Sequence, residues 1–288
     1  MTSTLPDELG AGRRPAPAAM LNKVPAITAS FWVIKVLGTT VGETAADYLD
    51  DTLGLGLNTT SVVVGLALAL AFVAQLRARR YVPAIYWLVV VLISVAGTLM
   101  TDNLVDGHGV SLDVTTIGFA AALGLTFLGW FRSERTLSIH TIVTTRRECW
   151  YWLTVLFTFA LGTSAGDLFA EKLGVGYWPT VGIVAAVIAA ITFAHYALKL
   201  NAVLAFWLAY ILTRPLGASI GDGMSQPHKA GGLGLGTTGT SVIFLGVILA
   251  LVVFLAVTKV DQTERVETRH DLDELEGVDD PEDDGVRV

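Results

Sequence analysis

The sequence predicts an all-α fold, a polytopic membrane protein whose eight transmembrane helices form four parallel two-helix repeats. Composition is the first reason: of 288 residues, 53% are hydrophobic and 16% are charged, and the mean hydropathy is +0.60. Ordinary soluble domains carry about 25% charged residues. The other two reasons are a motif that occurs four times and a series of long apolar stretches.

The repeated motif is an aromatic residue, Trp, nine residues, Gly, four residues and Asp. It occurs without gaps at Phe31-Trp32…Gly42…Asp47, Tyr86-Trp87…Gly97…Asp102, Tyr151-Trp152…Gly162…Asp167 and Phe206-Trp207…Gly217…Asp222. The starts are 55, 65 and 55 residues apart, so the second half repeats the first at an offset of 120. This spacing indicates two successive duplications of one helical unit.

Apolar stretches of about 20 residues can cross roughly 30 Å of hydrocarbon as helices. Eight are expected, near 26–49, 59–78, 83–104, 112–132, 149–171, 178–198, 202–223 and 238–258. The first stretch of each pair carries the motif and is rich in Gly, Ala, Ser and Thr, which allow close helix packing in lipid. We therefore expect the motif helices inside and the plainer helices outside. A simpler interpretation is that the motif glycines serve packing alone.

The domain division follows from composition. Residues 1–22 form a Pro/Ala-rich arm that we expect to be disordered, and 23–260 form the membrane domain. Its repeats lie at about 23–80, 81–135, 146–199 and 200–260. The tail, 261–288, holds twelve acids and three arginines, and we expect a disordered cytoplasmic extension.

Basic residues set the expected orientation. They concentrate in the segments before the first stretch and after the second, fourth, sixth and eighth, which lie on one side of an eight-span arrangement. By the positive-inside rule both termini are cytoplasmic, and the motif tryptophans lie near the cytoplasmic interface, where indole rings anchor helices.

Each motif helix also carries a polar stripe, because residues four apart share a helix face. The stripes contain Lys35, Thr39, Glu43 and Asp47 in the first copy, Ser94, Thr98 and Asp102 in the second, Thr163 and Asp167 in the third, and Arg214 and Asp222 in the fourth. Ionisable residues within spans usually face a bundle interior or a water-filled cavity. Four stripes related by repetition are expected to face one another.

The carboxylates predict a cation site. An aspartate near a helix C-terminus faces the negative end of the helix dipole, so four of them require compensation. Asp47, Asp102, Asp167, Asp222 and Glu43 are therefore candidate metal ligands or proton carriers. Hard cations prefer oxygen ligands, and a divalent metal such as Mn²⁺ is one example. An alternative placement puts the aspartates at the external water interface.

The remaining polar residues of the stripes have expected supporting roles. Lys35 and Arg214 are candidate charge partners that hold the carboxylates when no cation is bound. Thr39, Ser94, Thr98 and Thr163 are candidate supporting groups.

The function that these residues favour is transport or export of a small cation. A non-transporting scaffold with a structural polar core is the alternative, and an anion or small-organic transporter that uses Lys35 and Arg214 is a variant of the first. No catalytic set is recognisable, so an enzyme is not expected, nor is a cofactor. The sequence has no basic patch with interleaved aromatic residues, so nucleic-acid binding is not expected.

Two single residues carry local expectations. Pro215 removes a helical hydrogen bond, so the segment from Thr213 to Gly223 is expected to be kinked or partly unwound. Cys149 is the sole cysteine, which excludes an internal disulfide, and it is expected to pack within the protein.

Four segments carry a resemblance to a known family: KVPAITASFWVIKVLGTTVGETAADYL, AGTLMTDNL, LGTSAGDLFAEKLGVGY and FWLAYILTRPLGASIGD. They resemble the repeated segments of a bacterial family of uncharacterised, repeat-containing integral membrane proteins. The similarity covers roughly residues 23 to 258. It implies a repeat-built, multi-pass protein of the bacterial cytoplasmic membrane, and it implies no reaction.

Overall fold

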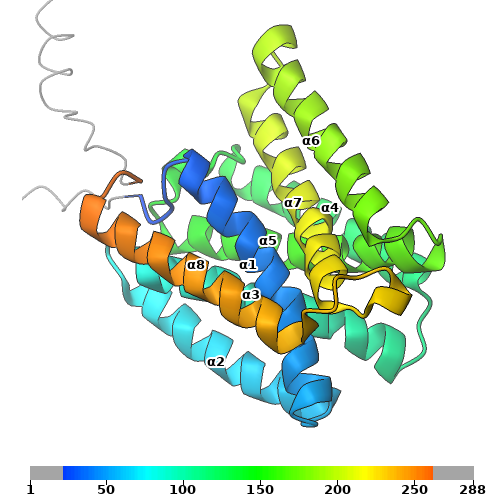
Figure 1. Ribbon diagram of the computed structural model, residues 1–288. Coiled ribbons are helices and arrows are strands. Elements are labelled where there is room, and N and C mark those ends of the chain that lie inside the picture. Colours follow the sequence, from blue (N-terminus) through cyan, green and yellow to red (C-terminus); the bar gives the residue numbers. More distant parts are fainter. Residues whose placement is uncertain (1–21, 262–288) are drawn as a thin grey trace, which may run out of the picture.

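The computed structural model describes residues 22–261, which form an all-α structure with no β-strand in that range (Figure 1). The predicted arm and acidic tail lie outside the described residues, except for Asn22 and Asp261. The α-helices are α1 (Ala29–Asp47), α2 (Leu57–Arg77), α3 (Pro83–Asp102), α4 (Leu112–Glu134), α5 (Thr145–Asp167), α6 (Tyr177–Leu198), α7 (Ala202–Ser225) and α8 (Gly236–Thr258).

Seven of these eight helices are long and apolar enough to cross a membrane. The exception is α1, although the sequence predicted an apolar stretch there. Its 19 residues include Lys35, Glu43 and Asp47, and charged groups are costly in hydrocarbon. The several long apolar helices suggest a multi-pass membrane protein.

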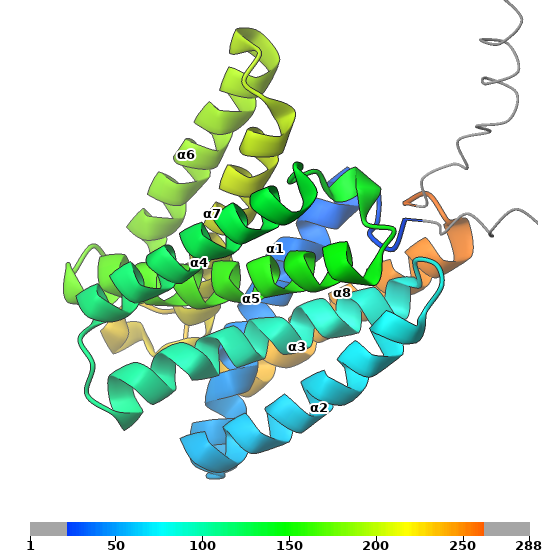
Figure 2. The ribbon, with the colours of Figure 1, turned by 180° about the vertical axis from the view of Figure 1, so that it is seen from behind.

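The four motif helices form a closed inner ring. Helix α1 packs against α3 and α7, and α5 packs against the same two helices. The other helices cover this ring from outside, with α2 on α3, α4 on α5, α6 on α7 and α8 on α1 (Figures 1 and 2). The expectation that the motif helices lie inside is confirmed. Each outer helix, however, packs mainly on the inner helix of the next repeat, and α8 closes the ring on α1.

The motif glycines are the points where neighbouring inner helices touch. A Cβ atom added at Gly42 would lie 1.8 Å from Ser94 Oγ, and one at Gly97 would lie 2.7 Å from Phe159 Cβ. The same contact joins Gly162 to Arg214 and Gly217 to Thr39. Each partner residue lies on the next helix around the ring, three positions before the motif glycine of that helix. These four glycines therefore set the distances within the ring, as the packing interpretation predicts.

Aromatic side chains fill the end of the ring that carries the motif tryptophans. Phe31, Tyr86, Tyr151 and Phe206, the residues before each Trp, are all buried, and the Tyr86 and Tyr151 hydroxyls are 2.5 Å apart. The tryptophans themselves differ in how far they are enclosed, and their depth in a membrane stays a prediction. Trp87, Trp152 and Trp207 are buried against these rings, while Trp32 is partly exposed. Packing among four large rings therefore excludes three of the indoles from the outer surface.

The opposite end of the ring is formed by the motif aspartates. Helices α1, α3 and α5 end at Asp47, Asp102 and Asp167, and each continues into one π-helical turn. These turns are Tyr48–Thr52, Asn103–Gly107 and Leu168–Lys172. Wide turns of this kind often occur at functional positions within helices.

Helix α7 departs from this pattern. It runs without interruption from Ala202 through Pro215 to Ser225, beyond its motif aspartate. Of the two alternatives expected after Thr213, partial unwinding is therefore wrong, and a kink stays a prediction. Cys149 also differs from expectation, because its side chain is exposed rather than packed.

Candidate functional site

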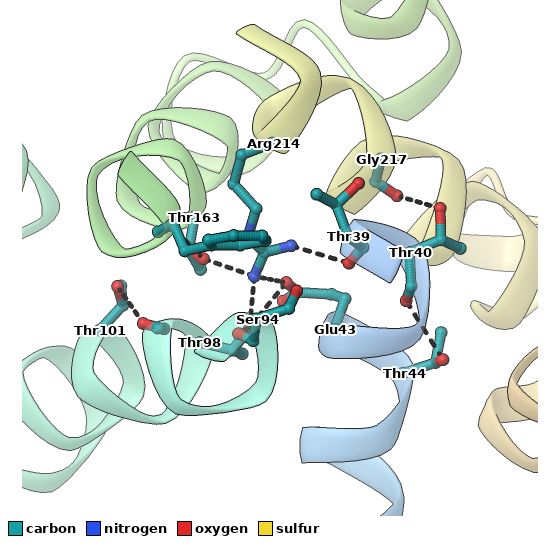
Figure 3. Close-up of polar contacts among 12 residues, drawn as sticks. Thr39, Thr40, Glu43, Thr44, Ser94, Thr98, Thr101, Thr163, Arg214 and Gly217 are labelled. Atoms are coloured by element: carbon teal, nitrogen blue, oxygen red, sulfur yellow. Dashed lines mark hydrogen bonds and ion pairs between the residues drawn. The ribbon is translucent and has the colours of Figure 1, made fainter. Parts of the chain in front are cut away.

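The centre of the ring is organised around the guanidinium group of Arg214, which is fully buried. Its Nη2 atom donates to Glu43 Oε2 at 2.8 Å and to Thr163 Oγ1 at 2.6 Å, and also to the hydroxyl of Thr98. Its Nη1 atom donates to the backbone carbonyl of Thr39 at 3.0 Å. Figure 3 shows the side chain entering from α7 and reaching groups on the three other inner helices. One arginine therefore connects all four repeats.

The partners of Arg214 occupy equivalent positions in the repeats. Glu43, Thr98 and Thr163 each follow the motif glycine of their helix, and the fourth such residue is Ala218. Repetition brings these positions together at the centre. Arg214 itself occupies the position of Thr39, Ser94 and Phe159. The fourth repeat therefore has a cation where the first two repeats have hydroxyl groups and the third has an aromatic ring.

Carboxylates gather next to this arginine. Glu43, Asp167 and Asp222 each offer an oxygen atom within 4.8 Å of the other two. They come from α1, α5 and α7, and Glu43 and Asp222 are buried while Asp167 is partly exposed. We call these three residues the carboxylate cluster. Glu43 belongs both to this cluster and to the ion pair with Arg214.

The other two candidate carboxylates lie outside the cluster. Asp47 and Asp102 are partly exposed at the ends of α1 and α3. Asp102 interacts electrostatically with Glu43 and Asp47, so these carboxylates are neighbours. All five candidate ligands thus lie at one end of the ring, and three of them meet closely enough to share one cation.

The cluster has the chemistry of a hard-cation site. Carboxylate oxygens bind Ca²⁺, Mg²⁺ and Mn²⁺ in preference to softer metals. Hydroxyl groups lie close by, since Thr98 Oγ1 is 3.2 Å from Glu43 Oε2. Ser94 Oγ is buried and has no hydrogen-bond partner among the described residues.

Lys35, the second expected charge partner, does not form an ion pair with a described carboxylate. Its side chain is 1% exposed, and Nζ has no hydrogen-bond partner within residues 22–261. Nζ lies 3.8 Å from the ring centroid of Phe159 and 4.2 Å from that of Tyr210. Lys35 is therefore surrounded by aromatic groups rather than by carboxylates.

Sequence reasoning missed Phe159 and Tyr210, although a signal for both was present. Tyr210 occupies the position that holds Lys35, Val90 and Val155 in the other repeats. Phe159 replaces the Thr or Ser of the first two repeats. Comparison of the repeats position by position identifies both as exceptions.

A second buried polar group, at the aromatic end of the ring, was also missed. Lys23 Nζ lies 2.7 Å from Glu148 Oε2, and Gln75 Nε2 donates to Glu148 Oε1 at 3.0 Å. Nearby, Tyr81 donates to Asp261 at 2.5 Å. Burial raises the pKa of the Asp261 carboxyl, and burial together with this bond raises the pKa of Tyr81 far above its usual range. These contacts connect the chain before α1 with α2 and α5, and the loop after α2 with the end of the described chain.

Fold and site together define a class: helical proteins built from four copies of one unit, with an ionic centre to which every copy contributes. The chain belongs to the family described as Repeat of Unknown Function (DUF347), whose model matches residues 30–81, 85–136, 150–201 and 205–261. The four matches coincide with the four motif copies. Searches of curated proteins and of solved structures gave no match.

Proposed function

We propose that all eight helices cross the membrane, α1 included, and that both termini are cytoplasmic. The charged face of α1 supports this arrangement, because Lys35 and Glu43 are buried within the ring and α8 covers the helix. Charged residues on such a face need not contact lipid. The proposed location is the cytoplasmic membrane of a bacterium.

We further propose that the protein transports a small cation, with a divalent metal such as Mn²⁺ as the leading candidate. The observation that carries this proposal is the convergence of three carboxylate oxygens within 4.8 Å, from three different inner helices. Carboxylates this close repel one another, and a bound cation relieves that repulsion.

Arg214 and a bound cation would share the carboxylate of Glu43. Glu43 belongs to the cluster and pairs with Arg214 at 2.8 Å. Binding of a cation would draw Glu43 Oε2 away from Arg214, because the carboxylate cannot direct the same lone pairs at both cations. In this mechanism Arg214 holds Glu43 in place while the site contains no cation.

Uptake of Mn²⁺ into reconstituted vesicles tests the proposal. Replacing Asp167 with Asn keeps the shape and removes one charge, so we expect at least a tenfold loss of flux, since charge-assisted contacts contribute about 1.5–3 kcal/mol each. Asp222→Asn is expected to have the same effect.

Asp113→Asn is the matched control. This aspartate is exposed and pairs with Lys172 outside the ring, so the flux should stay at the wild-type level. Absence of transport of every cation tested by the wild-type protein, or equal flux in all three variants, would contradict the proposal.

A scaffold without transport activity is the second candidate. The observation that favours it is that the terminal nitrogens of Arg214 donate to four groups of the protein, spread over the three other inner helices. Hydrogen bonds between helices of this kind can serve structure alone. On this proposal Asp167→Asn changes thermal stability, and vesicles containing either protein take up no cation.

A further inference from the structure

Lys35 places an amino group in the interior that the proposed transport site does not use. It lies one helical turn after Phe31 of the aromatic end and two turns before Glu43. The described chain supplies Nζ with two ring faces and with no hydrogen-bond acceptor. Aromatic faces attract ammonium groups, and this is how proteins recognise many ammonium ligands.

The cage around Lys35 consists of exceptions to the repeat. Phe159 and Tyr210 each introduce an aromatic ring at a position that is small, aliphatic or charged in the other copies. They come from α5 and α7, and the ammonium group comes from α1. Three repeats have thus diverged at the same point in space. Arg214 also belongs to this region, since its Cζ lies 5.8 Å from the Phe159 ring.

We infer that Phe159 and Tyr210 form an ammonium-binding cage, and that Lys35 occupies it as a tethered plug between the carboxylate cluster and the aromatic end of the ring. The cage stands on the geometry alone, whereas the role of Lys35 as a plug rests on the proposed transport function. The ligand class of the cage is a primary alkylammonium ion. In this structure the protein itself supplies that group.

Removal of the tether tests the cage directly. The Lys35→Ala variant of the full chain, purified in detergent, lacks the side chain beyond Cβ, so the ammonium group of added n-butylammonium chloride should bind between the two rings. We expect this salt to raise the Tm of Lys35→Ala by about 3 °C or more at saturation, and to leave that of the wild-type protein unchanged. 1-Butanol, which has a similar size and no charge, should have no such effect.

Further variants locate the binding. Phe159→Leu in the Lys35→Ala background should weaken butylammonium binding roughly tenfold, because one of the two ring contacts is lost. Phe157→Leu, on the same helix and outside the cage, is the matched control and should not weaken it. Equal rescue by 1-butanol, or equal binding after both Phe substitutions, would overturn the cage.

A second measurement applies if Lys35→Ala does not fold. Lys35→Met keeps the side-chain volume without charge, and a double-mutant cycle with Phe159→Leu measures the coupling. We expect Phe159→Leu to change the unfolding constant roughly tenfold less in the Lys35→Met background than in the wild type. Additive effects of the two substitutions would overturn the inference.

Vesicle flux separates the plug from the transport function. If Lys35 is a plug, Lys35→Ala vesicles should leak Mn²⁺ faster than wild-type vesicles, and n-butylammonium should slow the leak. Butylammonium binding without any Mn²⁺ flux in the wild type would refute transport and leave the cage standing. Wild-type transport that Lys35→Ala leaves unchanged would refute the plug alone.

Discussion

At the scale of single residues, the centre of the protein depends on one ion pair. Arg214 is fully buried, and it pairs with Glu43 at 2.8 Å. Two charges removed from water are costly unless they are paired and hydrogen-bonded. The threonines at positions 98 and 163 supply the additional acceptors. Loss of one member of such a pair leaves an uncompensated charge in the interior.

Glu43→Gln is therefore expected to lower the free energy of unfolding by about 3 kcal/mol, because Arg214 keeps its charge and loses its counter-ion. Thermal unfolding of the purified protein in detergent measures the change. Asp113→Asn breaks an exposed pair with Lys172 and should cost less than about 1 kcal/mol. Similar costs for both substitutions would show that the central pair is not buried in solution.

The residue scale is also where sequence reasoning reached its limit. Helix periodicity predicted the polar stripes, and the carboxylate cluster contains Glu43, Asp167 and Asp222 from them. The partner of Lys35 was not predictable in this way. Phe159 and Tyr210 lie on other helices, and the distances between helices depend on packing that periodicity does not contain.

At the scale of helices, close approach at the motif glycines determines the ring. Each of these glycines faces the neighbouring inner helix, whereas Gly65 on α2 has no atom within 4 Å of an added Cβ. The sequence predicted small residues at the interfaces for this reason. It did not predict the π-helical turns after the first three aspartates. Such a turn contains one extra residue, and no particular amino-acid composition distinguishes it from an α-helical turn.

Gly97→Ala provides the test at this scale. The new methyl group would lie 2.7 Å from Phe159 Cβ and 3.1 Å from the backbone nitrogen of Ala160, so two helices would have to separate. Overpacking of this kind costs about 1–3 kcal/mol, and thermal unfolding should show it. Gly65→Ala adds the same methyl group in open space and should be neutral or slightly stabilising. Equal stability of the two variants would contradict the packing role.

At the scale of the whole molecule, the repeats are interlocked rather than separate. Every outer helix covers the inner helix of the following repeat, so no two-helix unit buries its own apolar surface. The lengths of the apolar stretches predicted the number of helices, and the small residues of the motif stretches predicted their inner position. The sequence did not predict that each outer helix packs on the inner helix of the following repeat. All four outer helices have similar compositions, which do not specify the inner helix that each one covers.

Orientation in the membrane is testable with single cysteines. In a Cys149→Ser background, the Asp106→Cys variant should react with a membrane-impermeant maleimide in intact spheroplasts. The Arg79→Cys variant should react after permeabilisation, because the basic loops are predicted to be cytoplasmic. Both positions are exposed in the structure, so access to the reagent depends on the side of the membrane. The reverse pattern of labelling would invert the proposed topology.

The closure of α8 onto α1 means that the order of the repeats along the chain is arbitrary for the folded protein. The two ends of the described chain already meet, with Ala26 N donating to Asp261 O at 2.9 Å. A circular permutant that joins residue 261 to residue 22 through a short linker, and that begins at Leu137 between α4 and α5, keeps every helix contact. We expect it to fold with a Tm within a few degrees of the wild-type protein. A permutant opened inside α5 should fail, since it divides a helix that contributes to the carboxylate cluster.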